Sequence, residues 1–336
     1  MSIRRTLQLL FLALCGLLAA AGAAVAQEPQ KVNLHHYPGT MLSLVTYVGV
    51  EQNLFKKHGL EVQLAGIPAG TDAMSALLAG GVDIMLNSGD NFIRALEKGS
   101  PDMRVVVGNI KQMPFSVVVR SDLPVTASSP QEAIKSLAGK QLGVLTRGGS
   151  TDIIFRALVT WSGLNPDRDA TWIPVGGPPT AVPAMLNKQI DAYLAFEPFQ
   201  TTVVTQNKAG RVILDMRKGQ GPGNLMDFPY NFYIAKSETL TARPEMMRRV
   251  VAAYVEAHAF MQNPANLAAV VGSAAKYIKM DEPLLRQMIV DNLPTYSASV
   301  TEAGLAKWTS FARSYLGVAK DFKPADLMAR DFVPRQ

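Results

Sequence analysis

Short strand-like segments alternate with helix-like segments over residues 32–214, and no other feature of the sequence constrains the fold as strongly. Residues 60–64 alternate apolar and polar side chains, which is typical of a half-buried strand, and the helix-like segment at residues 71–79 follows. The same order recurs at residues 141–145 and 150–161. Strands that alternate with helices of this length predict βαβ units and largely parallel sheets.

The pattern repeats 108 residues further along the chain. Residues 73–78 (Ala-Met-Ser-Ala-Leu-Leu) match residues 181–186 (Ala-Val-Pro-Ala-Met-Leu), and residues 82–86 (Val-Asp-Ile-Met-Leu) match residues 190–194 (Ile-Asp-Ala-Tyr-Leu). Each copy predicts a helix with one apolar stripe, a turn, and an aspartate that begins a buried strand. Any two βα units share part of this pattern, but agreement without a gap over fourteen positions favours one unit used once in each of two lobes.

Two passages rich in chain-breaking residues separate the blocks. Residues 121–130 are polar and contain two prolines, and residues 219–229 contain three glycines and two prolines. We interpret both as crossovers, which assigns residues 27–120 and 229–336 to lobe I and residues 121–228 to lobe II. The end of the chain reads as successive helices. The predicted fold is therefore α/β, with two α/β lobes joined by two crossovers, a C-terminal helical segment, and a cleft between the lobes.

The first 26 residues have the pattern of a secretory leader. Arg4 and Arg5 precede an apolar run over residues 7–24, and a small-x-small signal-peptidase site follows at residues 24–26. We predict cleavage at the end of this site and a periplasmic location. The alternative is a membrane anchor, for which the apolar run lies at the lower limit of length. The arginines do not decide between the Sec and twin-arginine routes. Cys15 is the one cysteine, so no disulfide, thiolate nucleophile or cysteine-bound metal is predicted in the mature chain.

Composition and charge argue against several other functions. The formal net charge is +6 without any long run of lysine and arginine, so nucleic acid is not predicted as a partner. His35 and His36 are neighbours on a predicted strand, where successive side chains point to opposite faces, so no metal site is predicted there. No pattern indicates a nucleophile beside an ordered base. We therefore expect neither enzymatic activity nor a cofactor.

Candidate ligand-binding residues lie where predicted strands end and the next helices begin, because ligands of open α/β sheets bind beyond the carboxyl ends of the strands. Helix N-termini there offer free N–H groups to an anion, although Ser, Thr and Asp at such positions are also ordinary helix caps. Aromatic residues near the second crossover either line a pocket or belong to the core. The candidates are Tyr37, Thr40, Gly70, Thr71, Ser88, Asp90, Gly149, Ser150, Thr151, Glu197, Phe228 and Tyr230.

Two of these candidates, Asp90 and Glu197, are acids. A carboxylate in the cleft accepts a hydrogen bond from an N–H or O–H group of a ligand, but it repels a simple anion. An anionic ligand would therefore require a neutralising cation, for which Arg147 and Lys111 are the candidates. The chemistry of these acids leaves the ligand class open.

Three segments, in order, carry a resemblance to a known family. They are Glu-Gln-Asn-Leu-Phe-Lys-Lys-His-Gly-Leu-Glu-Val at residues 51–62, Ala-Leu-Leu-Ala-Gly-Gly-Val-Asp at residues 76–83, and Leu-Ala-Gly-Lys-Gln-Leu-Gly-Val at residues 137–144. With the leader, they make the chain resemble the periplasmic binding proteins for nitrate, aliphatic sulfonates, taurine and thiamine-pyrimidine precursors. The resemblance implies the type II periplasmic-binding-protein fold, a monomer, and delivery of a small molecule to the permease and ATPase subunits of an ABC importer.

The resemblance also implies ligand contacts at residues 37–40, at residues 147–151 and at Glu197. The expected ligand is a small sulfonate, nitrate-like or carboxylate anion. The alternatives are a thiamine-precursor pyrimidine or other nitrogen heterocycle, and a sensing role as the ligand-binding partner of a membrane receptor. Eukaryotic enzymes of pyrimidine synthesis have a related fold, but they carry a cysteine-rich motif that the mature chain lacks.

Overall fold

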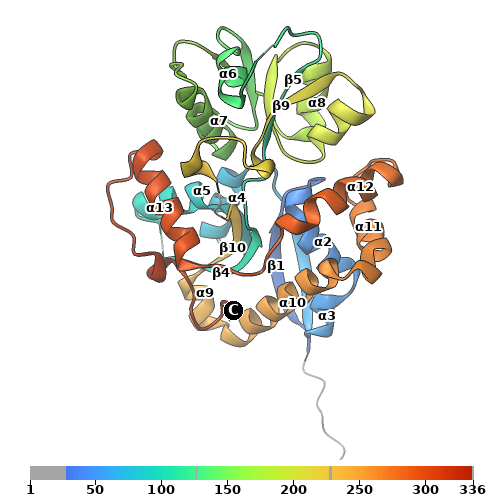
Figure 1. The fold of residues 1–336 in the computed structure, drawn as a ribbon. Coiled ribbons are helices and arrows are strands. Elements are labelled where there is room, and N and C mark those ends of the chain that lie inside the picture. The colour runs from blue at the N-terminus through green and yellow to red at the C-terminus, as the bar shows by residue number, and fades with distance from the viewer. Residues whose placement is uncertain (1–27, 101, 126, 227–228, 335–336) are drawn as a thin grey trace, which may run out of the picture.

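The computed structural model describes residues 28–100, 102–125, 127–226 and 229–334. The predicted leader and Phe228 lie outside the described residues. Figure 1 shows two lobes, one above the other, and each contains its own β-structure. No described helix is long and apolar enough to cross a membrane.

The lower lobe of Figure 1 contains a parallel pair of strands and a three-stranded sheet. A parallel bridge between Leu34 and Ile84 lies between them. The pair consists of β1 (Gln30–His36) and β2 (Leu60–Gly66), and the sheet has the order β3 (Met85–Ser88), β10 (Asn231–Lys236) and β4 (Met103–Ile110).

The upper lobe is built on a five-stranded sheet. The central strands of this sheet are largely buried, whereas several residues of the outer strands β7 and β9 are exposed or half-exposed. The order is β7 (Thr171–Pro174), β6 (Gln141–Val144), β8 (Ala192–Ala195), β5 (Ser116–Arg120) and β9 (Gly210–Asp215).

Both lobes have mixed sheets, so the prediction of largely parallel sheets is only partly correct. β1 pairs with β2, and β6 pairs with β7 and β8, in parallel. β10 runs antiparallel to β3 and β4, and β5 runs antiparallel to β8 and β9. Each of these two strands is the first that the chain forms after passing between lobes. The first residue of each strand therefore pairs with the last residue of an adjacent strand. Asn231 of β10 pairs with Ser88 of β3, and Ser116 of β5 pairs with Ala195 of β8.

The strand β5 corrects the predicted position of the first crossover. The prediction placed residues up to 120 in lobe I, but β5 belongs to the five-stranded sheet. The chain therefore crosses between Ile110, the last residue of β4, and Ser116, the first residue of β5. The prediction was wrong because residues 121–130 have the composition of a linker, while hydrogen-bond partners decide which sheet a strand joins.

The internal repeat is confirmed in the structure by its helices and its aspartates. α4 (Gly70–Leu78) and α8 (Pro178–Leu186) have the same length and the same offset as the repeat. The carboxylate of Asp83 accepts a hydrogen bond of 2.8 Å from the backbone N–H of Asn33, and that of Asp191 accepts one of 2.8 Å from the N–H of Gln141. In both lobes, the aspartate that precedes one strand therefore accepts a hydrogen bond from the backbone of another strand.

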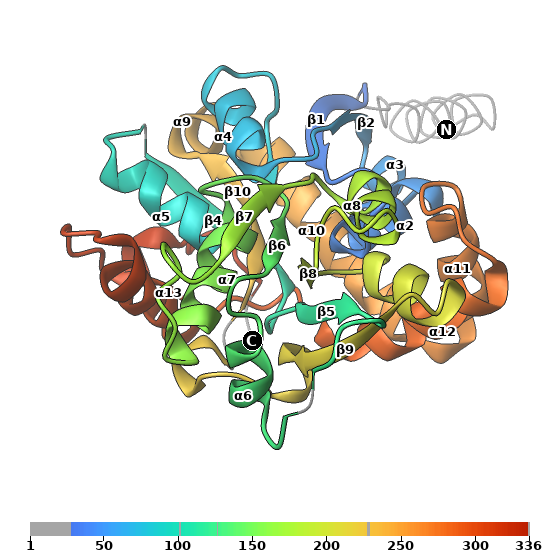
Figure 2. The ribbon, with the colours of Figure 1, turned by 90° about the horizontal axis from the view of Figure 1, so that it is seen from above.

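The helices after β10 belong to the lower lobe rather than to a separate unit. α10, α11, α12 and α13 surround the β-structure of that lobe in Figures 1 and 2. α10 buries one apolar face against α2, and α13 packs on α5. The helices of this lobe are α2 (Leu44–Glu51), α3 (Leu54–Lys57), α4, α5 (Gly89–Glu97), α9 (Ser237–Ala242), α10 (Pro244–Gln262), α11 (Leu267–Ala275), α12 (Glu282–Asn292) and α13 (Glu302–Leu316).

The upper lobe has fewer helices, and short turns follow its last strands. β9 leads into the 3-10 turn η3 (Met216–Lys218), and η6 (Leu293–Thr295) extends α12 of the lower lobe toward it. The other helices of the upper lobe are α6 (Pro130–Lys135), α7 (Ser150–Trp161), α8 and the π-helical segment η2 (Thr201–Gln206).

Candidate functional site between the lobes

A small cavity of about 30 Å³ lies between the lobes. Six of the twelve candidate residues line it: Tyr37, Gly70 and Tyr230 from the lower lobe, and Gly149, Ser150 and Thr151 from the upper lobe. The remaining lining residues are Leu42, Asn91, Leu145, Thr146 and Phe196. The cavity is thus formed jointly by strand ends and helix starts of both lobes.

A cluster of amides makes the lower wall of the cavity. The side-chain amide of Asn87 donates to the carbonyl of Gly70 at 2.8 Å, and Asn91 donates to the side-chain oxygen of Asn87 at 3.1 Å. The hydroxyl of Tyr37 donates to the same oxygen at 3.4 Å. A Cβ atom at Gly70 would lie 2.7 Å from Asn87 Oδ1 and from Asn91 Nδ2. Glycine at this position therefore allows the polar side chains to approach the start of α4.

A chain of hydroxyl groups crosses from one lobe to the other. The Oγ atoms of Ser88 and Ser150 are 2.6 Å apart, and Ser150 Oγ donates to Asp90 Oδ1 at 2.6 Å. Because Ser150 uses its proton for Asp90, Ser88 is the donor in the contact between the serines. Arg94 adds a second contact between the lobes, since its Nη1 donates to the carbonyl of Gly148 at 2.6 Å. These bonds hold the lobes together beside the cavity.

Asp90 is a fully buried carboxylate. Its Oδ2 atom has no hydrogen-bond partner among the described residues. Burial raises the pKa of Asp90, while the hydroxyls of Ser150 and Ser88 and the charge of Arg94 offset part of this effect. Burial and the charge of Asp90 likewise raise the pKa of Tyr230. The carboxylate therefore makes the neighbourhood of the cavity unfavourable for further negative charge.

The N-terminus of α7, predicted as an anion site, has its own acid. Asp152 in the first turn accepts a hydrogen bond of 2.7 Å from the N–H of Gly148 and pairs with Arg156 at 2.8 Å. The hydroxyl of Thr151 accepts from the N–H of Leu145 at 3.0 Å. Arg147, one of the two cations expected to neutralise an anionic ligand, lies 3.5 Å from Asp152. Most polar groups around the start of α7 therefore already have hydrogen-bond or ion-pair partners within the upper lobe.

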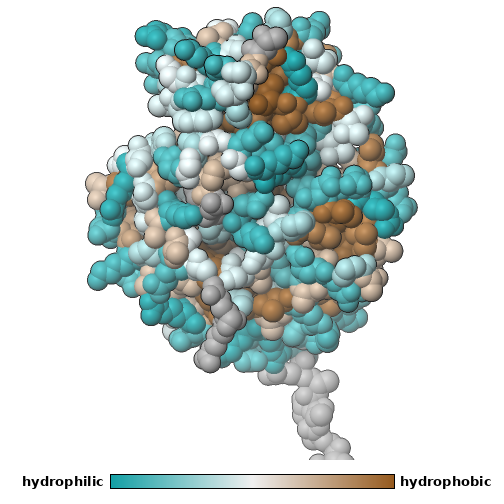
Figure 3. Space-filling model, viewed as in Figure 1, coloured by the Kyte–Doolittle hydropathy of each residue, from teal (hydrophilic) through white to brown (hydrophobic). Residues whose placement is uncertain are grey.

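A larger groove of about 660 Å³ opens beside the cavity, between the upper lobe and α12. In the view of Figure 3, hydrophilic residues gather where the two lobes meet. Glu197 lines the groove, and its neighbour Phe196 lines the cavity, so the two spaces adjoin. The backbone carbonyl of Glu197 also accepts a hydrogen bond of 3.2 Å from Met41 of the lower lobe.

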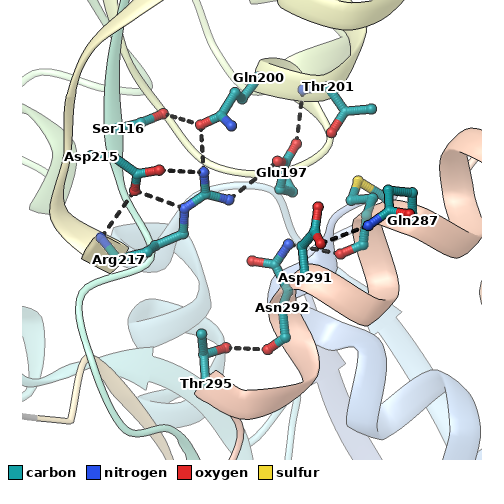
Figure 4. Close-up of polar contacts among 11 residues, drawn as sticks. Ser116, Glu197, Gln200, Thr201, Asp215, Arg217, Gln287, Asp291, Asn292 and Thr295 are labelled. Atoms are coloured by element: carbon teal, nitrogen blue, oxygen red, sulfur yellow. Dashed lines mark hydrogen bonds and ion pairs between the residues drawn. The ribbon is translucent and has the colours of Figure 1, made fainter.

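Arg217 is the cation that neutralises Glu197, and neither Arg147 nor Lys111 does so. Its guanidinium contacts Glu197 at 3.3 Å and Asp215 at 2.8 and 2.9 Å, as Figure 4 shows. The second oxygen of Glu197 accepts from the N–H of Thr201 at 3.0 Å. Burial raises the pKa of Glu197, and the N–H of Thr201 and the charge of Arg217 offset part of the rise.

The guanidinium of Arg217 contacts three side chains, those of Glu197, Asp215 and Gln200. Its Nη2 also donates to the side-chain oxygen of Gln200 at 2.8 Å, and Ser116 donates to the same oxygen at 2.6 Å. Burial lowers the pKa of Arg217, but hydrogen bonds and attraction to Asp215 and Glu197 outweigh it and raise that pKa. The guanidinium is thus committed to two carboxylates of its own lobe.

The model of the NMT1-like family matches residues 26–275. The chain belongs to the NMT1-like family. A Brucella abortus protein named as a binding protein is 30% identical over 242 residues, which cover 71% of this chain and 68% of the relative.

Solved structures of periplasmic binding proteins share the fold of this NMT1-like chain. The alkanesulfonate-binding protein SsuA from Xanthomonas axonopodis pv. citri, bound to MOPS, gives a TM-score of 0.73 at 17% identity and covers 90% of this chain and 98% of its own. The nitrate-binding protein NrtA from Synechocystis PCC 6803 gives 0.73 at 14% identity, with 91% and 87% covered. These matches confirm the predicted type II periplasmic-binding-protein fold.

One enzyme also has this fold. The desulfurization enzyme DSZB gives a TM-score of 0.62 at 15% identity and covers 90% of this chain and 97% of its own. The fold alone therefore does not separate binding proteins from enzymes, and the function of this NMT1-like protein has to be argued from its site.

Five candidate residues lie near the cavity or the groove without lining the cavity, and Phe228 lies outside the described residues. Ser88 and Asp90 lie behind Ser150, and Glu197 lines the groove. Thr40 donates its hydroxyl proton to the carbonyl of Tyr37 at 3.0 Å. Thr71 lies in the first turn of α4, where its carbonyl accepts from Ser75.

The two neighbouring histidines are engaged with the protein. His35 is buried with its ring nitrogens 3.1 and 2.9 Å from the carbonyls of Leu86 and Ile67, and burial lowers its pKa to about 4. His36 contacts the hydroxyl of Tyr47 at 3.3 Å. Within the described ranges, no group of three His, Cys, Asp or Glu residues could hold a metal ion.

Proposed function

We propose that this NMT1-like protein is the periplasmic solute-binding component of an ABC importer. It captures a small molecule between its two lobes and delivers it to the permease, which the ATPase subunit energises. The observation that carries this proposal is the hydroxyl chain from Ser88 through Ser150 to Asp90, because it joins the candidate residues of both lobes at one cavity. Family membership and the two-lobed fold support it.

Ligand entry on this proposal requires the lobes to separate. A cavity of about 30 Å³ holds only about one or two water molecules. The chain passes between the lobes at residues 111–115 and again between η3 and β10, and rotation at these two passages would open the cleft. Closure then places the ligand against the start of α7 on one side and the amide cluster on the other.

The residues around the cavity support a ligand that donates hydrogen bonds over a bare anion. Among the described residues, no lysine or arginine lines the cavity, and Asp90 is buried behind Ser150 with one oxygen unpartnered. A nitrogen compound with N–H groups can donate to the hydroxyl and amide oxygens of Thr146, Ser150 and Asn91 in the lining and adds no negative charge near Asp90, whereas nitrate or a simple sulfonate has no donor to offer. Of the two predicted classes, the site therefore favours the nitrogen heterocycle.

A binding role is also better supported than catalysis. Ser150 lines the cavity and donates to the carboxylate of Asp90, but no histidine of the described residues lines the cavity to act as a base for Ser150. The proton of Ser150 is held by Asp90, and Glu197 is held by Arg217. Neither Asp90, which is buried behind Ser150, nor Glu197, which is paired with Arg217, lines the cavity in a position to transfer a proton to a ligand there.

A thermal-shift screen of the mature chain tests the proposal. Sodium nitrate, ethanesulfonate, acetate and 4-aminopyrimidine are compared at equal ionic strength, since a ligand that binds the folded state raises the melting temperature with the logarithm of its concentration. We expect the aminopyrimidine to give the largest shift. A clear shift with nitrate or ethanesulfonate alone would contradict the ligand class, and no shift with any solute, including a periplasmic extract, would contradict the binding role.

A matched pair of serine variants tests the site. Ser150→Ala should weaken the affinity for the bound solute about three- to tenfold, because it removes a hydroxyl that lines the cavity and partners Asp90. Ser162→Ala is the control, since Ser162 ends the same helix and donates to the carbonyl of Val159. Equal affinities of the two variants would place the ligand elsewhere.

A further inference from the structure

The groove beside the cavity presents two charges that have no ion-pair partner among the described residues. Asp291, on α12 of the lower lobe, accepts a hydrogen bond of 2.8 Å from the side-chain amide of Gln287 and makes no ion pair within 4 Å in the part of the chain that the structure covers. Lys218, at the end of η3 in the upper lobe, is exposed and likewise has no ion pair in those ranges. The two residues line the same groove from different lobes and do not pair with each other.

The other charges of the groove neutralise one another in part. Three carboxylates and two cations line it in total. Glu197 and Asp215 share one cation, because the guanidinium of Arg217 lies between them and contacts both, as Figure 4 shows. Asp291 projects from α12 on the opposite side of the same view. Asp291 thus remains without an ion pair on the lower wall. On the upper wall Lys218 has no direct ion pair among the described residues, and the group of Glu197, Arg217 and Asp215 carries one surplus negative charge.

We propose that the groove binds an amphoteric ligand, with an ammonium group at Asp291 and a carboxylate or similar anionic group at Lys218. This inference rests on the proposed capture of a solute between the lobes. It keeps the N–H donors that the cavity favours and adds an anionic end at Lys218 of the groove, so it replaces the neutral heterocycle with an amphoteric nitrogen compound. A volume of about 660 Å³ lies in the range of small-molecule sites, whereas the central cavity is far smaller. A ligand with both charges contacts both walls, and it therefore stabilises the closed arrangement of the lobes.

The amphoteric class reconciles the charges of the groove with those of the cavity. A simple anion would meet the net negative charge of the groove lining and the buried Asp90 behind the cavity. A simple cation would satisfy Asp291 but would leave Lys218 unpaired and repel it. Apolar side chains of Leu284, Met288 and Val212 also line the groove and suit an aliphatic chain between the two charged ends.

Isothermal titration with three probes of equal chain length tests the inference. The probes are 5-aminopentanoate, pentylamine and pentanoate, used with the mature chain at one ionic strength. We expect 5-aminopentanoate to bind at least about tenfold more tightly than either singly charged analogue, because it makes two charge contacts instead of one. Equal affinities of the three probes would overturn the inference.

Charge variants assign the two ends. Asp291→Asn should weaken 5-aminopentanoate and pentylamine about three- to tenfold and leave pentanoate unchanged, and Lys218→Gln should weaken 5-aminopentanoate and pentanoate by a similar factor. Glu282→Gln is the matched control, because Glu282 is exposed at the start of α12 and does not line the groove. A loss of affinity in the control equal to that in Asp291→Asn would overturn the assignment.

Exchange of the two charges gives an outcome that a structural defect cannot produce. The double variant Asp291→Lys with Lys218→Asp should recover binding of 5-aminopentanoate, since the probe can reverse its direction in the groove, while each single reversal abolishes it. If a pyrimidine or an anion binds the mature chain tightly but 5-aminopentanoate does not, the groove inference fails and the capture of a solute stands. A chain that binds no probe of any class overturns both.

Discussion

Removal of Arg217 is the sharpest test of how the interface between the lobes is built. The side chain is 14% exposed and contacts Glu197 and Asp215, whose side chains are 5% and 6% exposed. Arg217→Met keeps most of the length and apolar surface of the side chain but leaves both carboxylates buried without a cation. Breaking a buried pair in this way costs about 3–5 kcal/mol, because the remaining charge is desolvated and uncompensated.

The structure places the expected loss at the lower end of that range. Each carboxylate keeps a backbone donor after the change: Asp215 accepts from the N–H of residue 217, and Glu197 accepts from the N–H of Thr201. We therefore expect a loss of about 3 kcal/mol in the free energy of unfolding at neutral pH. Gln200 loses one donor, but Ser116 still donates to its side-chain oxygen.

The loss should depend on pH in a defined direction. Without the guanidinium, burial holds the folded-state pKa of Glu197 above the unfolded value, so the folded state prefers its protonated form. A group with a raised folded pKa contributes stability at low pH that is lost as the pH rises through that pKa. The gap between the wild type and Arg217→Met should therefore be widest near pH 7 and should narrow toward pH 4.

Urea denaturation at pH 7 and pH 4.5, followed by circular dichroism, measures both effects. Arg168→Met is the control, because Arg168 is 77% exposed beside Asp169 and such surface changes usually stay within about 0.5 kcal/mol. Adding Glu197→Gln to Arg217→Met should restore part of the stability. A loss below about 1 kcal/mol at pH 7, or a gap that widens in acid, would refute the reasoning.

Two further changes test the region around the cavity. Gly89→Ala should destabilise the chain by about 1–3 kcal/mol in urea denaturation, because the new Cβ would lie 2.3 Å from the ring of Trp308, whereas Gly272→Ala in the open face of α11 should be neutral or stabilising. Equal effects would contradict the packing described for Gly89. Asp90→Asn should raise the melting temperature above pH 7 and lose this advantage in acid, since burial raises the pKa of Asp90 and only its ionised form is costly. An effect that does not vary with pH would show that the cost is not electrostatic.

Local periodicity was sufficient to predict most helices and several strands. The helix expected at residues 71–79 is α4 at Gly70–Leu78, and the successive helices expected at the end of the chain include α10 at Pro244–Gln262. Both have an apolar stripe at helical spacing, and α10 begins with a proline in its first turn. Such features depend only on residues within a few positions of each other, so one sequence contains all the information required.

Contacts between distant segments were not predictable in the same way. The pairing of Glu197 with Arg217 joins two loops of one lobe, and the approach of Asp90 to Ser150 joins two lobes. Residues 215–217 read Asp-Met-Arg, a pattern in which the aspartate caps the turn and the arginine folds back onto it. That local pattern is compatible with an ion pair, although we did not predict one, and nothing in the sequence indicates that Glu197 joins it.

The two copies of the repeat show why the interface carries the charges it does. The copies keep the same helix and the same strand-joining aspartate, but they diverge where the strands end: Ser88-Gly89-Asp90 in one lobe corresponds to Phe196-Glu197-Pro198 in the other. Each lobe therefore brings one acid to the interface, and the two acids are neutralised differently. Glu197 has a cation within its own lobe, whereas Asp90 depends on a hydroxyl of the opposite lobe. Opening the lobes leaves the first pair intact and breaks the second. Of these two acids, Asp90 is therefore the one whose pKa depends on the separation of the lobes, because the hydroxyl of Ser150 lowers that pKa in the closed arrangement.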